Sequence, residues 1–226
     1  FMDETPQPEG YEYLYLTGHP MGSSLYYQCI GINRTEEDLK NYPQMAGAGL
    51  GDYIYEDIDK NGKIDAKDML RSDLNTIPQI VFGLTGNFQY KNFDLSILFQ
   101  GQALARFHYT PLQAPLEGNI TEEMATQSWT LDRTDAKYGR INSTNNRKES
   151  TMWLRNASFL RLKNLELGYN FSGKALKSAG IKGLRLYIGG YNLFTITGLK
   201  ELDPETNNTA TYPLMRVFNT GVKVTF

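Results

Sequence analysis

The chain has 226 residues, a net charge of −2 and a pI near 5.8, so it is long enough to bury a core and gives no indication of nucleic-acid binding. One cysteine, Cys29, and two histidines, His19 and His108, exclude an intrachain disulfide and a histidine-rich metal site. No apolar run approaches the ~18 residues of a membrane helix, so any part that crosses a membrane has to use strands.

The N-terminal part of the chain shows little periodicity. Residues 11–17 and 24–32 each predict a short extended segment. The stretch from Phe1 to Pro6 lacks the basic segment and apolar core of a signal peptide. Because the chain also begins with Phe rather than Met, we expect it to be a piece of a larger protein.

Residues 57–68 carry the most specific chemical motif. Oxygen donors at positions one, three, five, nine and twelve, with Gly62 at position six, match a calcium-binding loop, and position seven would offer a backbone carbonyl. The predicted ligands of a Ca²⁺ ion are Asp57, Asp59, Asn61, Lys63, Asp65 and Asp68. Asp68 replaces the longer Glu of EF-hands, which predicts weaker binding. The alternative is a metal-free turn whose side chains cap backbone amides.

Alternation of apolar and polar residues predicts strands in the rest of the chain, each near the ~9–11 residues that cross a bilayer. The predicted strands are residues 82–90, 93–100, a run that ends with 164–171, 184–189 and the terminal 219–226. Their connections alternate between short and long. Lys91-Asn92 is a tight turn, roughly fifty residues follow from Ala103 to Arg155, residues 172–183 contain one helical turn that ends at Gly180, and residues 195–215 form another long loop.

Short turns on one side and long loops on the other are typical of outer-membrane barrels, whose short turns face the periplasm. The terminal residues agree with this topology. Asn219, Gly221, Val224 and Phe226 have the spacing of the signal by which bacterial outer-membrane barrel proteins are recognised for insertion, and the topology leaves Phe226 on the periplasmic side. The alternative interpretation is an edge strand of a soluble β domain.

Several stretches, in the same order, resemble the C-terminal part of SusC/RagA-type TonB-dependent outer-membrane transporters of the Bacteroidetes. They are residues 51–57 with the Asp loop, 90–96 with Gln100-Gly101, 159–169, 191–194, 203–205 and 212–213. Residues 159–169 are the most specific of these. Asp59 and Asn61 depart from the family's usual order of Asn and then Asp, and Gly139 stands where Pro is usual.

The resemblance implies an all-β fold of antiparallel transmembrane β-barrel strands, the C-terminal part of a barrel of about 22 strands with long extracellular loops. Residues 1–79 would form an extracellular loop region with one or two further strands and the calcium-like loop, and residues 80–226 the barrel strands. The implied function is TonB-dependent import of oligosaccharides or peptides across the bacterial outer membrane, without enzymatic activity. The implied partners are a SusD-like surface lipoprotein, TonB through an upstream region, and the rest of the barrel with its plug.

Two other classes of function compete with import. One is a soluble calcium-dependent carbohydrate-binding or adhesion module, which the Asp loop permits. The other is an enzyme that uses the carboxylates of Glu122, Glu123, Asp132 and Asp135, but these lie in a polar loop without a histidine, and a solvated loop is favoured. For Arg155, Arg161 and Lys163, salt bridges with a structural role are favoured over lining a lumen.

Overall fold

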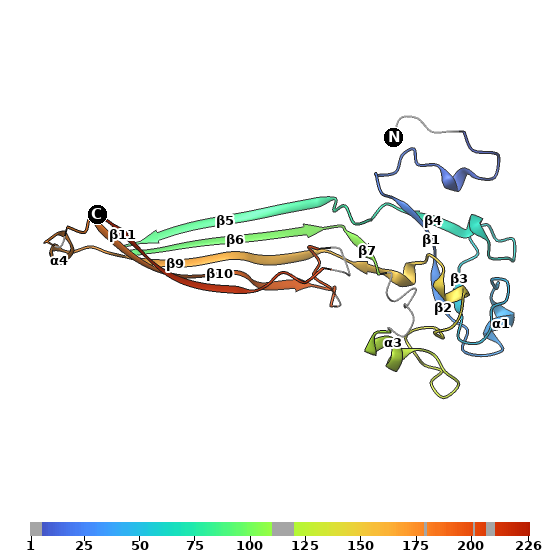
Figure 1. Cartoon of the computed structure of the whole chain (residues 1–226). Coiled ribbons are helices and arrows are strands. Elements are labelled where there is room, and N and C mark those ends of the chain that lie inside the picture. Colours follow the sequence, from blue (N-terminus) through green and yellow to red (C-terminus); the bar gives the residue numbers. More distant parts are fainter. Residues whose placement is uncertain (1–5, 110–119, 179, 201, 207–210) are drawn as a thin grey trace. The chain divides into compact units, whose positions relative to one another are not determined.

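The computed structural model describes all residues except 1–5, 110–119, 179, 201 and 207–210. The chain forms two compact units, each built from two stretches of sequence (Figure 1). The loop unit comprises residues 1–77 and 106–155, and the sheet unit comprises residues 78–105 and 156–226. The predicted division at residue 80 lies close to the first boundary, and the long connection predicted after residue 103 is assigned to the loop unit.

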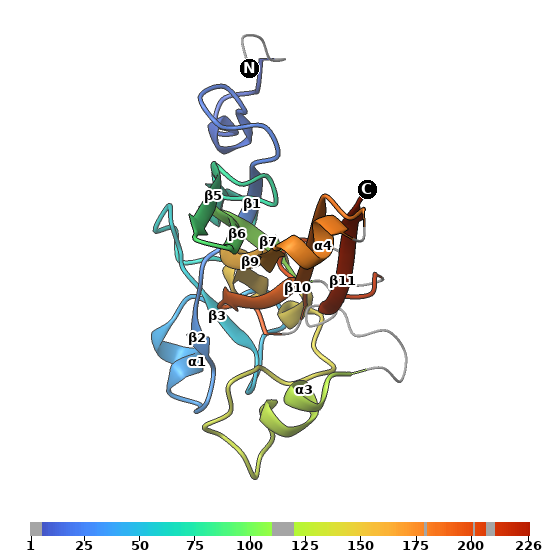
Figure 2. The same ribbon diagram turned by 90° about the vertical axis from the view of Figure 1, so that its left-hand side faces the viewer.

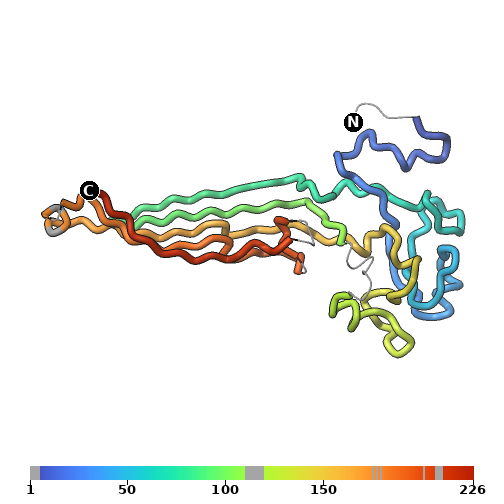
Figure 3. Tube along the Cα trace, viewed as in Figure 1, coloured from blue at the N-terminus to red at the C-terminus, as the bar shows by residue number. Residues whose placement is uncertain are grey.

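The sheet unit is one five-stranded antiparallel sheet with the order β11-β10-β9-β6-β5. The chain runs back and forth along its length (Figure 3), and the view along the strands shows β5 at one edge and β11 at the other (Figure 2). The strands are β5 (Ile80–Tyr90), β6 (Phe93–Ala103), β9 (Phe159–Phe171), β10 (Gly183–Thr197) and β11 (Val217–Thr225). A two-residue turn joins β5 to β6, and α4 (Lys174–Ser178) lies between β9 and β10. Each predicted strand is confirmed, and most are longer than predicted.

Strand register gives the sheet one apolar and one polar face. Residues that pair directly across neighbouring strands lie on the same face. One such row runs from Phe88 through Leu95, Leu167 and Ile188 to Thr220. The apolar face also carries Phe82, Leu84, Ile97, Phe99, Leu165, Leu186, Val222 and Val224, and the polar face carries Thr85, Gln89, Asp94, Gln100, Arg161, Glu166, Arg185 and Lys223. Each strand therefore contributes its apolar residues to one shared face of the sheet and its polar residues to the other.

One irregularity interrupts this register in the middle of the sheet. Between β6 and β9 the pairing shifts after Leu98, so that Lys163 is an additional residue in β9. Between β9 and β10 it shifts again after Tyr191, where β10 gains a residue and Asn192 adopts a φ of 53°. Each additional residue is a β-bulge, which re-aims the neighbouring side chains. Lys163 and Asn164, adjacent in sequence, therefore both serve the polar face.

The loop unit is made of short elements. Strand β1 (Ser24–Tyr27) pairs with β4 (Met69–Ser72), β2 (Cys29–Ile32) with β3 (Tyr53–Tyr55), and β7 (Arg106–His108) with β8 (Leu154–Asn156). The helical segments are η1 (Glu12–Leu14), α1 (Asp38–Asn41), η2 (Ala66–Asp68), α3 (Glu122–Gln127), η3 (Asn145–Arg147) and η4 (Thr151–Trp153). The extended segment predicted at 24–32 corresponds to β1 and β2, whereas residues 11–17 contain η1 and no strand.

Aromatic side chains form the core of the loop unit. Trp153 packs edge-on against Tyr53, with ring centroids 5.7 Å apart, and stacks on Tyr138 at 6.5 Å. The backbone amide of Tyr53 donates to Asn146 Oδ1 at 2.7 Å, and so ties β3 to a segment far along the chain. No α-helix among the described residues combines the length and the apolar character that crossing a membrane requires.

The two faces of β5 provide a direct test of which one meets the membrane. Leu84 on the apolar face is 67% exposed, and its neighbour Thr85 on the polar face is exposed as well. We expect Leu84→Arg to reduce the amount of assembled protein in the outer membrane, because an Arg in the middle of a barrel's lipid-facing surface costs ~2–4 kcal/mol. Thr85→Arg is the matched control and should assemble nearly as wild type. Folded yield, measured by heat-modifiable gel mobility, decides the matter, and equal yields would contradict this facing of β5.

Candidate functional site

The predicted calcium loop lies between β3 and β4. Carboxylate oxygens of Asp57, Asp59 and Asp68 lie within 4.8 Å of one another, although Asp59 and Asp68 are 9 positions apart in the sequence. Asp68 is fully buried, Asp57 is half-buried and Asp59 is exposed. Three converging carboxylates are hard oxygen donors of the kind that Ca²⁺ prefers.

Backbone amides hold these carboxylates in place. Asp57 Oδ2 accepts from the amide of Gly62 at 2.8 Å, and Gly62 adopts a φ of 80°, which favours glycine. Asp68 Oδ1 accepts from the amide of Ile58 at 2.8 Å. Ile64 is buried, as expected of a residue that anchors the loop in apolar packing. An ionised carboxylate has about four acceptor positions, so these hydrogen bonds leave capacity for a cation.

Other predicted ligands make different contacts. Asp65 caps η2, because its Oδ1 accepts from the amide of Lys67 at 2.8 Å while its own amide donates to Asp68 Oδ2 at 2.8 Å. Asn61 Oδ1 accepts from the amide of Lys63 at 2.8 Å. The geometry thus brings the carboxylates of Asp57, Asp59 and Asp68 together, uses Asp65 as a cap, and keeps Asn61 beside Asp59, to whose Oδ2 its Nδ2 donates at 2.9 Å.

The terminal residues divide between the two faces of β11. Val222 and Val224 pair with Leu186 and Leu184 on the apolar face. Gly221 lies opposite Tyr187 on the polar face, where a Cβ would come within 2.5 Å of the ring carbon Cζ. Glycine is therefore required for the tyrosine ring to lie against β11. Asn219 lies on the same face as Gly221, and the side chain of Phe226 is 76% exposed just after the strand ends.

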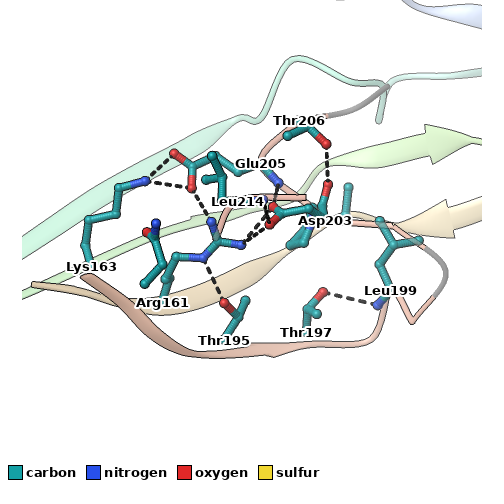
Figure 4. A network of polar contacts seen from close by, with 12 residues as sticks. Arg161, Lys163, Thr195, Thr197, Leu199, Asp203, Glu205, Thr206 and Leu214 are labelled. Carbon is teal, nitrogen blue, oxygen red and sulfur yellow. Dashed lines mark hydrogen bonds and ion pairs between the residues drawn. The ribbon is translucent and has the colours of Figure 1, made fainter. Parts of the chain in front are cut away.

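A buried ion network on the polar face was not predicted as a site (Figure 4). Arg161 in β9 is only 2% exposed. Its Nη2 donates to both carboxylate oxygens of Asp203 at 2.7 and 2.8 Å, and its Nη1 donates to Glu205 Oε2 at 2.7 Å. Its Nε donates to Thr195 Oγ1 at 2.8 Å, and Lys163 Nζ donates to Glu205 Oε1 at 2.7 Å. Two cations and two anions are neutralised in one cluster.

Asp203 connects this network to the segment between β10 and β11. Its carboxylate also accepts from the backbone amides of Glu205, at 3.0 Å, and Leu214, at 3.2 Å. Burial alone raises the pKa of Asp203, but these amides and Arg161 outweigh it, so the pKa lies below its usual value. The carboxylate therefore stays ionised and ties two points of the segment to β9.

The sequence contained the signals for this network but not its geometry. Salt bridges were favoured for Arg155, Arg161 and Lys163, and the structure shows them for Arg161 and Lys163. Arg155 donates to the backbone carbonyl of Met152. A second ion cluster lies closer to the short turns on the same face. Arg185 bonds Asp94 through Nε at 3.0 Å and Glu166 through Nη2 at 2.8 Å.

Two of the candidate catalytic carboxylates lie at the start of a helix. Glu122 and Glu123 begin α3, and Glu123 pairs with Lys137. Burial raises the pKa of the Cys29 thiol to about 11, so this side chain stays protonated and weakly nucleophilic near neutral pH.

Comparisons with known proteins agree with the architecture. TonB-dependent receptor P3 of Formosa agariphila is 28% identical over 227 residues, a match that covers 92% of this chain, and TonB-dependent receptor SusC of Bacteroides thetaiotaomicron is 29% identical over 223 residues, covering 89%. The solved structure of the RagAB peptide transporter superposes on 90% of the chain with a TM-score of 0.69 and 23% identity. No family model matches the chain.

The chain is homologous to the TonB-dependent receptors. It spans about a fifth of their length, since each of these matches covers 22% of the related chain. The resemblance inferred from residues 51–226 is confirmed. The homology places the chain in the bacterial outer membrane, and the apolar face of the sheet is suited to that environment. The homologues are receptors rather than enzymes.

The ion network predicts unequal roles for its two cations. Arg161→Met leaves the side chain of Asp203, which is 7% exposed, without its ion-pair partner. Breaking a buried pair in this way costs about 3–5 kcal/mol, so we expect Asp203, Glu205 and Leu214 to detach from β9. Lys163→Met is the control, because Lys163 is partly exposed and Glu205 keeps its bond to Arg161. Hydrogen exchange at the amides of Glu205 and Leu214 measures the effect, which should be large for Arg161→Met and small for Lys163→Met. Equal protection in the two variants would refute the tether.

Proposed function

We propose that this chain is part of a TonB-dependent importer that carries oligosaccharides or peptides across the bacterial outer membrane. The observation that carries the proposal is the match to TonB-dependent receptors over about nine-tenths of the chain. The amphipathic sheet supports it, since a barrel wall needs one face for hydrocarbon and one for an aqueous interior.

Within such an importer, each unit takes a distinct role. The sheet unit supplies strands of the barrel wall, and its edges β5 and β11 pair with strands of the same barrel outside this chain. The loop unit belongs to the extracellular side, where ligands and partners gather. The partners would be a SusD-like surface lipoprotein and, through regions outside this chain, the plug and TonB.

The soluble calcium-dependent module is the weaker candidate. Its core would have to cover the apolar face of the sheet, yet Leu84, Phe88, Ile188 and Val222 are all more than half exposed on that face. Solvent exposure of this many apolar side chains on one surface is unusual for a soluble monomer. Contact with lipid in place of water makes the exposure of these apolar side chains favourable.

Uptake in cells tests the transport function. A strain that lacks the protein, complemented with the wild-type gene, should accumulate labelled oligosaccharides or labelled peptides, and removal of TonB should abolish the same uptake. Oligosaccharides and peptides are offered in separate assays, so the class whose uptake is lost in the deletion strain is the class that the protein transports. Unchanged uptake of both classes in the deletion strain would refute the import function.

Loss of the terminal aromatic should affect assembly rather than ligand binding. Phe226 is exposed beyond the last strand and contacts no ion cluster, so its removal takes away an insertion signal and no substrate group. We expect deletion of Phe226 to lower the amount of protein at the cell surface while the inserted fraction binds ligand normally. Tyr212→Ala, which removes another exposed aromatic, is the control and should leave surface levels unchanged. Normal surface levels with lost ligand binding would instead assign Phe226 to a ligand site.

We also propose that the Asp loop binds Ca²⁺ through Asp57, Asp59 and Asp68, which the convergence of their oxygens supports. Removing two of the three carboxylates in the double variant Asp57→Ala/Asp59→Ala should abolish binding, as measured by calorimetric titration of the purified protein with CaCl₂. Asp65→Ala is the control, because Asp65 caps η2 and lies outside the converging group, so this variant should still bind. If the double variant binds calcium as well as wild type does, Asp57 and Asp59 are not ligands. The loop is then a turn whose side chains cap backbone amides.

A further inference from the structure

The apolar face of the sheet contains a hollow of about 550 Å³ that none of the roles above uses. It lies over β6, β9, β10 and β11 and falls entirely within the sheet unit. Its apolar lining comes from Leu95, Leu165, Leu167, Ile188, Leu193 and Phe218. The volume is in the range of sites that hold small ligands.

Backbone features create this hollow. Gly190 in β10 lies between Leu165 of β9 and Phe218 of β11, so one row of the apolar face lacks a side chain. Leu193, displaced by the bulge after Tyr191, folds over the glycine, and a Cβ on Gly190 would lie 2.5 Å from Leu193 Cδ2. The depression therefore belongs to the strand register and does not depend on a flexible side chain.

The hollow is elongated rather than compact. Two further depressions adjoin it, of about 310 and 560 Å³, and all three share Leu167. Together they follow the apolar face from Phe218 toward Phe93 and Tyr90. A long apolar depression fits a hydrocarbon chain better than a sugar or a peptide, which would leave polar groups unpaired.

Its position selects one membrane leaflet. Leu95 is two residues from the start of β6, Leu167 is four from the end of β9 and Ile188 is five from the start of β10, all counted from the short-turn end. Gly190 and Phe218 are each seven residues from that end, and Leu193, ten residues away, folds back over Gly190. At ~3.3 Å per residue the groove therefore extends from roughly 7 to 23 Å along tilted strands, that is, from the turn side to about the middle of an apolar band ~25 Å tall. Short turns face the periplasm in such barrels. The leaflet on that side of the bacterial outer membrane consists of phospholipid.

We propose that this groove holds one acyl chain of an inner-leaflet phospholipid as a bound lipid. The groove continues the apolar face of the sheet, and its lining offers an acyl chain apolar side chains from β6, β9, β10 and β11. A chain held in this way exchanges more slowly than lipid on the smooth part of the same face. The inference requires membrane insertion and is independent of what is transported.

Filling the groove tests the proposal. The full-length protein is purified from outer membranes, exchanged into fresh detergent and examined by native mass spectrometry for bound molecules of phospholipid mass. We expect Leu167→Trp to lower the phospholipid-bound fraction roughly tenfold or more, since the indole takes the volume of several methylenes of the chain. Leu84→Trp adds the same side chain to the same face outside the groove and should retain lipid as wild type.

A second pair of variants covers the case in which the larger side chain prevents folding. Phe218 is 75% exposed at the rim of the groove, so Phe218→Ala should fold and release the lipid more readily, whereas Leu84→Ala should not. Equal phospholipid retention in Phe218→Ala, Leu84→Ala and wild type would overturn the proposal. Retention of a molecule of lipopolysaccharide mass in place of phospholipid would overturn it as well. If the wild-type protein retains phospholipid but supports no uptake, the transport function is wrong and the lipid proposal stands.

Discussion

Antiparallel pairing of five strands with a shared alternation is the constraint on which the sheet unit depends. Each strand places its apolar residues on the face that its neighbours also make apolar, so a slip of one residue in any strand would move leucines among the charges and arginines into the apolar row. The register is therefore fixed twice, by backbone hydrogen bonds and by the contrast between faces. A sheet whose two faces differ this much is stable only where the faces meet different surroundings, as the two faces of a barrel wall do.

On the polar face, each buried charge is neutralised by neighbouring side chains of opposite charge. Arg161 is almost fully buried, and an isolated guanidinium there would be costly, but a bidentate carboxylate, a second carboxylate and a hydroxyl occupy its donors. The same contacts fix the segment after β10, which would otherwise lose conformational entropy on ordering without compensation. The cluster is thus a structural tether on the face expected to line the transport path.

Periodicity predicted the strands well, because two-residue alternation is a local property, and it failed where the alternation breaks. For the third strand, the alternation indicated the end of the run, residues 164–171, but not its start. In the structure β9 begins at Phe159 and passes through the adjacent polar residues Lys163 and Asn164 with a bulge. The predicted fourth strand ended at Gly189, whereas β10 continues through the bulge after Tyr191 to Thr197.

The loop unit was largely beyond sequence reasoning because its contacts are distant in the chain. Tyr53 bonds Asn146, 93 residues away, and no short pattern records such a pairing. The Asp loop illustrates a finer limit. The spacing indicated which residues carry oxygens, but it could not show that Asp65 turns to cap η2 while Asp68 joins Asp57 and Asp59. Spacing fixes the order of donors, and only the fold of the loop decides which of them converge.

The paired bulges link both faces of the sheet. An additional residue in β9 places Lys163 beside Arg161 and so completes the ion network, and an additional residue in β10 folds Leu193 over Gly190 and so forms the wall of the groove. Removing either bulge would shift every pair beyond it and abolish the feature on its own face. Because the shifts are adjacent and add along β10, they also increase the local twist that a curved wall requires. One local departure from regular pairing thus supports the tethered segment, the proposed lipid groove and the curvature of the sheet.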